Sequence, residues 1–342
     1  MLDIDAILKP ISDEAPAGAD MSYDPAYQEF EDLARGTPER SIGDTVIPAT
    51  PPDWNKVLEK GTSLLKQTHD LRLLVRLTVA RTAVKGLEGL TDALALLTAA
   101  VDRNWQQMHP ALDADDPEAI ERINALQSLS VAPGGFADEA SFVRRVMEIP
   151  LTDSRQLGRF SLRDFKVATG DMAAGSGAEV PDSNTVDAAF QDTSTEHLQA
   201  SLERTAAARE SLNTLRKSII DHVGAGSAAD FSELDTTLIE ISSLLEEHLR
   251  RRGIGVAAPI AGSDDGTGRS SAPGEIRSRH DVVAALDRIC QYYDQAEPAS
   301  PVPLLLRRAQ RLAHKSFVEI VRDLTPNALD EIERIGGEKY GE

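Results

Sequence analysis

The sequence predicts an all-α fold: a helical N-terminal bundle, an amphipathic helical hairpin and a small helical C-terminal oligomerisation module, joined by flexible linkers. Apolar residues recur at spacings of three and four through most of the chain, which is the period of a half-buried helix. Aromatic residues form 4% of the chain against 41% hydrophobic residues in all, so aliphatic side chains must fill the core. Residues that cap helices precede several of the apolar runs.

The first 55 residues are rich in proline and glycine, which break regular structure. We expect loops there, with one short helix at 25–34. Residues 41–48 are expected to be extended and mobile.

Four helices are expected next, and they form most of the N-terminal domain. Asp53 and Asp70 are placed to cap the first two, and a third covers residues 90–105. Asp116 and Pro117 match the N-cap and first-turn positions of the fourth. Short connections favour antiparallel neighbours in a bundle. The apolar face expected for the fourth helix consists of Ile120, Ile123 and Leu126.

The N-terminal domain is expected to span residues 1–170. A further helix is predicted around 142–147, followed by a short segment and a final stretch, SLRDFKVA. The tract 171–192 is rich in Gly, Ala and Ser and is expected to be a linker.

A helical hairpin is expected over residues 193–252, with heptad-like spacing in its second helix. Thr193 and Glu196 match a capping box at its start. Whether this hairpin belongs to the N-terminal domain or stands alone stays open at this point. Residues 253–275 form the clearest linker, and the module 276–342 is small enough to favour stabilisation by oligomerisation.

The charge balance argues against nucleic-acid binding. The chain carries 56 acidic and 36 basic residues, a formal net charge of −20, whereas phosphate contacts need clustered Lys and Arg. A strongly negative net charge is most simply explained by solubility, and binding to a basic surface of a partner is the more specific alternative. The N-terminus has no secretory signal pattern and no run approaches a membrane span, so we expect a cytoplasmic protein without direct membrane insertion.

The sequence contains no pattern typical of an enzyme, and we expect no catalytic, cofactor or metal site. The seven histidines are scattered without an HExxH pair, and neither a GxSxG elbow nor a phosphate loop is present. The one cysteine, Cys290, lies on an apolar helical stripe, which favours a buried thiol over a nucleophile.

Two parts of the chain resemble the TssA family of the bacterial type VI secretion system. The stretches PISDEAPAGADMSYDPAYQEFEDLARG, PPDWNKVLEKG and NWQQMHPALDADDPEAIERINAL resemble its ImpA-type N-terminal region, and RFSLRDFKVATGD looks like the segment that closes it. The tail, with ICQYY and EPASPVPLLLRRA, resembles the C-terminal region of the shorter class, which is similar to phage baseplate proteins. The matching N-terminal positions are Asp20, Asp24, Pro25, Asp53, Trp54, Asp70, Leu71, Arg72, Trp105, His109, Pro110, Asn124 and Leu126.

The resemblance implies a non-enzymatic scaffold. It implies a ring-forming C-terminal region and contacts with baseplate, sheath and inner-tube proteins near the inner membrane, with docking at the inner-membrane complex a further possibility. We expect partner binding near Asp20, Asp24 and Trp54. An adaptor or assembly chaperone of another machine is the alternative. The candidate ring interface, an apolar run with arginines, consists of Leu304, Leu305, Leu306, Arg307, Arg308 and Phe317.

Overall fold

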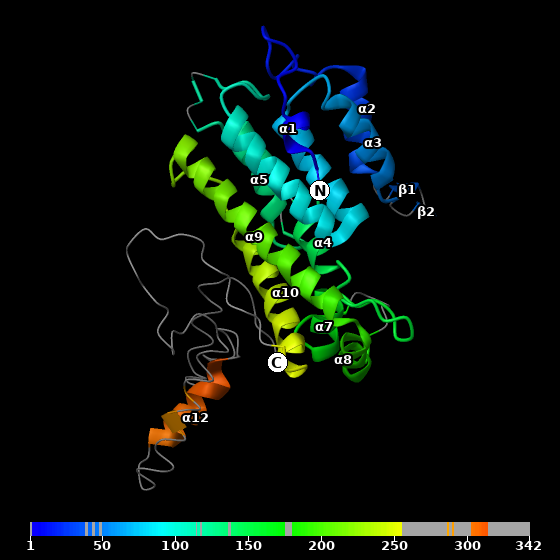
Figure 1. Cartoon of the computed structure of the whole chain (residues 1–342), viewed down its shortest axis with the longest axis vertical. Coiled ribbons are helices and arrows are strands. Elements are labelled where there is room, and N and C mark those ends of the chain that lie inside the picture. The colour runs from blue at the N-terminus through cyan, green and yellow to red at the C-terminus, as the bar shows by residue number, and fades with distance from the viewer. Residues whose placement is uncertain are drawn as a thin grey trace. The chain divides into compact units, whose positions relative to one another are not determined.

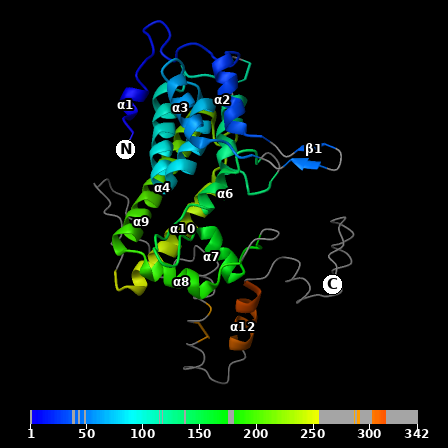
Figure 2. The same cartoon turned by 90° about the vertical axis from the view of Figure 1, so that its right-hand side faces the viewer.

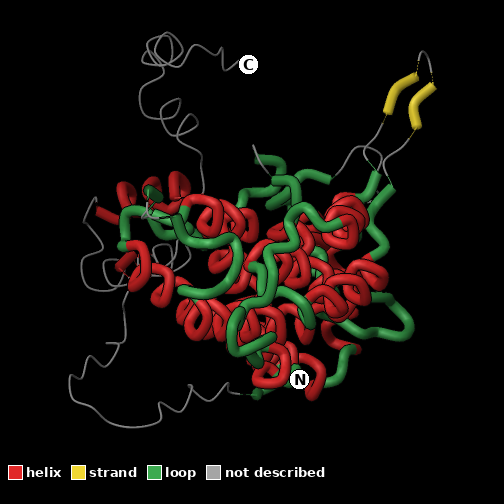
Figure 3. Tube along the Cα trace, turned by 90° about the horizontal axis from the view of Figure 1, so that it is seen from above, coloured by secondary structure: helices red, strands yellow, loops and turns green. Residues whose placement is uncertain are grey.

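The computed structural model divides the chain into two units, residues 1–259 and 260–342. It describes residues 2–254 except 38–39, 43–44, 48–49, 114, 117, 136–137 and 175–179, and beyond them only 286, 289–290 and 302–313. The regular secondary structure of this described part is almost entirely helical, which confirms the predicted all-α class (Figure 1). Its strands are β1 (Arg40–Ile42) and β2 (Thr45–Ile47), an antiparallel pair that projects from the helices (Figure 3).

Three helices precede the centre of the first unit. They are α1 (Ile4–Ile7), α2 (Pro25–Arg35) and α3 (Trp54–Leu64), and Figure 2 shows α2 and α3 side by side. The predicted short helix and the predicted cap at Asp53 are both confirmed, because the Asp53 carboxylate accepts a hydrogen bond from the Lys56 amide at 3.3 Å.

The central element, α4 (Leu71–Asn104), consists of two antiparallel arms, 71–85 and 87–104. They meet at Gly86, whose φ of 57° and ψ of −136° suit only glycine. Arg81 and Asp92 pair across the arms at 2.6 Å, and the Leu71 amide donates to the His109 carbonyl at 2.8 Å. The predicted cap at Asp70 and the two antiparallel helices are therefore confirmed.

Gly89, on the second arm of α4, lies close to the backbone of the first arm. A methyl group there would lie 2.1 Å from the Arg81 carbonyl oxygen, a backbone atom that cannot turn away. We expect Gly89→Ala to lower the free energy of unfolding by about 2–3 kcal/mol, because overpacking forces the backbone to shift. Gly226→Ala, where no atom lies within 4 Å, is the control and should change it by less than about 1 kcal/mol. Equal urea midpoints for the two variants would contradict this packing.

The helix α5 (Ile120–Gln127) differs from its prediction. It begins at Ile120, after Ala119 in a left-handed conformation, and the Asp116 carboxylate reaches forward to the Ile120 amide at 2.8 Å. Pro117 lies outside the described residues. The expected apolar face is also wrong in part, because Ile120 is 52% exposed while Arg122 is buried.

Three short elements follow: the 3-10 turn η1 (Ser128–Ser130), α6 (Phe142–Met147) and α7 (Leu162–Thr169). The predicted helix at 142–147 is confirmed. In α7 the Ser161 side chain and the Asp164 carboxylate form a reciprocal capping box, so SLRDFKVA is helical from its second residue.

The expected linker 171–192 is wrong over its second half, which forms α8 (Ser183–Asp192). Val186, Ala189 and Phe190 are buried, and the Phe190 ring stacks on His248 with centroids 4.0 Å apart. The expected capping box at Thr193 is wrong as well. Thr193 ends α8, and the Ser194 hydroxyl accepts from the His197 amide at 3.2 Å.

The hairpin consists of α9 (Thr195–Val223) and α10 (Ser232–Arg251). It packs against α4, whose Thr91 and Thr98 hydroxyls each donate to a carbonyl of α9 at 3.0 Å. The question that the sequence left open is thereby answered: the hairpin belongs to the N-terminal unit.

In the second unit, α12 (Val302–Ala313) contains most residues of the candidate ring interface. Leu305 is 69% exposed, and Arg307 and Arg308 are exposed too. Phe317 and the Leu304 side chain lie outside what the structure describes, so the ring interface stays a prediction. None of the described helices has the length and apolar character to cross a membrane.

Candidate partner-binding site

Several residues of the N-terminal motif meet at the N-terminal end of α4, which Asp70 caps. The Asp70 carboxylate, fully buried, accepts from the Arg72 amide at 2.8 Å and from its guanidinium at 2.6 and 3.1 Å. Burial by itself would lower the pKa of Arg72, but the hydrogen bonds and charge of Asp70 raise it. The same guanidinium donates to the Ser22 hydroxyl at 2.7 Å, which ties the N-terminal loop to α4.

The loop over residues 17–24 is fixed at two further points. The His69 amide donates to the Ala17 carbonyl at 2.8 Å, and the His109 ring nitrogen Nε2 lies 3.1 Å from the Gly18 carbonyl oxygen. The Asp20 carboxylate accepts from the hydroxyl and amide of Ser22, and these bonds lower the pKa of Asp20. Asp20 is thus held charged at the surface.

Arg122 anchors the segment that leaves α4. It is 1% exposed, and its guanidinium donates to the carbonyl oxygens of Trp105, Met108 and Pro110. The guanidinium also lies 4.8 Å from the centroid of the Trp105 ring. Burial lowers the pKa of Arg122 to about 10, so the side chain remains a cation at neutral pH. A cation suits this place because the carbonyls at a helix C-terminus carry partial negative charge.

This framework displays what we call the Tyr23 surface, made of Tyr23, Leu112 and the carboxylates of Asp20, Asp113, Asp116 and Glu121. The Tyr23 side chain is 97% exposed, and Leu112 is 37% exposed. These residues line a hollow of about 330 Å³. Large exposed apolar side chains framed by charge are typical of a protein-binding surface.

The structure brings two of the three predicted partner residues to this end. Asp20 lies in the Tyr23 surface, while Asp24 caps α2 by accepting from the Ala26 amide at 2.7 Å. Trp54 lies apart, because it begins α3 under the Arg145 guanidinium at 4.6 Å and lines a cavity beside Gly86. Gly86 is fourteen residues along the first arm of α4 from Arg72, which is about 21 Å at 1.5 Å per residue.

The roles of Arg122 and Tyr23 were not predicted from the sequence. Arg122 falls within a helix read as apolar on one face, and only its carbonyl partners show its role. Tyr23 stands between two motif aspartates, a position that sequence alone does not reveal as exposed. In the described part of the chain, no group of three or more His, Cys, Asp or Glu is placed to hold a metal ion.

Comparisons with known proteins identify the class of protein to which this framework belongs. Residues 8–130 match the family model described as "ImpA, N-terminal, type VI secretion system", which covers the Tyr23 surface and its anchors. The fold resembles a solved structure from Burkholderia cenocepacia, the N-terminal domain including the conserved ImpA_N region of the TssA component of the type VI secretion system. That match has a TM-score of 0.59 and 26% identity, and it covers 73% of this chain and 95% of that one. The class is therefore that of type VI secretion components with an ImpA N-terminal region.

A full-length relative makes the assignment more particular. The type VI secretion system component TssA1 of Pseudomonas aeruginosa is 33% identical over 353 residues, covering 98% of this chain and 99% of the relative. The chain belongs to the TssA family of type VI secretion system components.

Proposed function

We propose that this chain is a non-enzymatic cytoplasmic scaffold that organises baseplate and contractile-tail assembly in the type VI secretion system. The observation that carries the proposal is the similarity to TssA1 over 98% of the chain, because it includes the C-terminal module as well as the ImpA region. A surface with an exposed tyrosine among carboxylates adds to it.

Oligomerisation is the first element of the proposed mechanism. A ring needs a heterologous interface that closes on itself, and we place it in the module 276–342, around α12. The 69% exposure of Leu305 beside two exposed arginines supports an interface on this helix. A ring would carry several N-terminal units, so that weak individual contacts add up to tight binding.

Partner binding by the Tyr23 surface is the second element. Its four carboxylates favour a basic surface on a baseplate, sheath or inner-tube protein, and Tyr23 supplies an apolar anchor that such a surface can bury. Docking at the inner-membrane complex would bring these contacts to the site of assembly.

Tyr23→Ala tests this element without disturbing the fold, because the side chain is 97% exposed. We expect the variant to bind purified baseplate, sheath or inner-tube partners about 30-fold more weakly, the loss typical of an interface hot spot. Ile239→Ala, at a 41% exposed position on α10, is the matched control and should bind normally. Surface plasmon resonance gives both values.

Equal affinity of Tyr23→Ala and the parent chain for every partner would remove this surface from the proposal. A point variant is needed because deleting residues 1–55 would also remove α2, whose Phe30 is fully buried in the core. Binding to none of the type VI proteins by either chain would favour the adaptor of another machine.

A further inference from the structure

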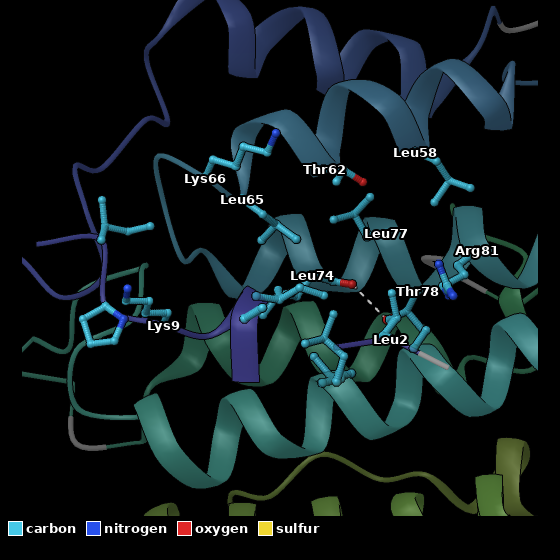
Figure 4. A pocket seen from close by; sticks show the side chains of 17 residues that line it. Leu2, Lys9, Leu58, Thr62, Leu65, Lys66, Leu74, Leu77, Thr78 and Arg81 are labelled. Carbon is cyan, nitrogen blue, oxygen red and sulfur yellow. Dashed lines mark hydrogen bonds between the residues drawn. The ribbon is translucent and has the colours of Figure 1, made fainter. Parts of the chain in front are cut away.

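A second candidate site lies on the first unit, away from the Tyr23 surface. It is a cleft of about 440 Å³ between α1, α3 and both arms of α4 (Figure 4). Its floor is apolar and consists mainly of Leu65, Leu74, Leu77, Leu96 and Leu97. We call it the α3–α4 cleft.

The charged side chains that line the α3–α4 cleft are all basic, in a chain whose formal net charge is −20. They are Lys9, Lys66 and Arg81. Arg81 pairs with Asp92, yet its Nε atom is buried without a hydrogen-bond partner in the described structure. Lys9 and Lys66 are exposed, and no carboxylate of the described residues forms an ion pair with either.

The shape of the cleft suits a helix. Along α3 and the turn that follows it, one wall runs from Leu58 through Thr62 to Lys66, a length of about 12 Å at the rise of a helix. Apolar anchors at positions i, i+4 and i+7 of a bound helix span about 10.5 Å, so three of them fit along this wall. A volume of 440 Å³ is within the range that encloses such side chains.

We propose that the α3–α4 cleft binds an amphipathic helix of a partner protein whose apolar stripe is flanked by Asp and Glu. The leucine floor receives the apolar anchors, and Lys9 and Lys66 pair with the flanking carboxylates. This partner has the opposite charge to the one that the Tyr23 surface favours. The unit would then bind two different partners at once, which goes beyond the proposed scaffold function.

The test uses the full-length protein and an array of 20-residue peptides tiling the baseplate, sheath and inner-tube proteins of the same secretion system. Bound peptides should carry apolar residues at i, i+4 and i+7 beside acidic ones. Thr62→Trp, which places an indole in the cleft from an exposed position, should weaken their binding at least 10-fold. Ser63→Trp, its exposed neighbour outside the cleft lining, should leave binding unchanged.

Charge is tested by a second pair of variants. Lys66→Glu should weaken the same peptides at least 5-fold, whereas Lys217→Glu, on exposed α9 surface, should not. Tyr23→Ala should keep full affinity for these peptides. Loss of binding at the cleft can therefore be distinguished from loss of binding at the Tyr23 surface. Thermal melts of each variant show whether it is folded.

Three outcomes would overturn the proposal. The first is that no tiled peptide binds with the expected pattern. The second is that bound peptides tolerate both Thr62→Trp and Lys66→Glu. The third is that no peptide binds, while dodecanoate, added as a probe, binds the parent chain but not the Thr62→Trp variant. That result would show that the cleft binds an acyl chain instead of a helix.

Discussion

Replacing Arg122 with leucine should lower the free energy of unfolding by about 3–5 kcal/mol. The substitution leaves the carbonyls of Trp105, Met108 and Pro110 without their buried donor, and it removes the contact with the Trp105 ring. Urea unfolding followed by tryptophan fluorescence measures the effect, because both tryptophans of the chain, Trp54 and Trp105, lie in the first unit.

Two controls separate this role from a general effect of charge. Arg122→Lys keeps the cation but cannot reach three carbonyls at once, so we expect a loss of roughly half that size. Arg103→Leu breaks an exposed ion pair with Asp5 and should cost less than about 1 kcal/mol. If Arg122→Leu were as mild as Arg103→Leu, the anchoring role of Arg122 would be wrong.

Asp70→Ala should have the second-largest effect, a loss of about 3 kcal/mol of unfolding free energy. The carboxylate is fully buried, caps the first arm of α4 and pairs with Arg72, so its removal takes away the cap and strands a half-buried cation. The loop over 17–24 should loosen with it, because Arg72 also holds Ser22.

A double-mutant cycle isolates the pair in the same urea experiment. Asp70→Asn keeps an acceptor for the Arg72 amide and should lose less than Asp70→Ala. Asp70→Ala combined with Arg72→Ala should be milder than the sum of the single changes, with a coupling of about 1–3 kcal/mol. Strict additivity of the two changes would show that the ion pair contributes nothing.

The helices that could be predicted from sequence are those with both a cap and a clear apolar stripe. Asp53 and Asp70 precede such stripes, and both act as expected. In contrast, α8 has three buried apolar residues in a polar segment, and a helix of ten residues is marginal by itself. Its stability comes from contacts such as Phe190 on His248, which no local pattern contains.

The candidate site was predicted only in part for the same reason. Asp20 was named from the family motif, but the exposure of Tyr23 depends on bonds from distant residues, including Arg72 to Ser22 and His109 to Gly18. Trp54 belongs to the same motif, yet the length of α4 separates it from that end. Motif membership thus identified the framework, while the tertiary structure identified the surface.

The most direct test of the scaffold proposal is multi-angle light scattering on the full-length protein beside a chain that ends at residue 255. This truncated chain contains nearly all of the compact first unit, whose counterpart in the Burkholderia cenocepacia protein is itself a solved domain. We predict a large, defined oligomer for the full chain and its collapse on truncation. Two monomers, or two oligomers of the same order, would contradict a ring built by residues 276–342.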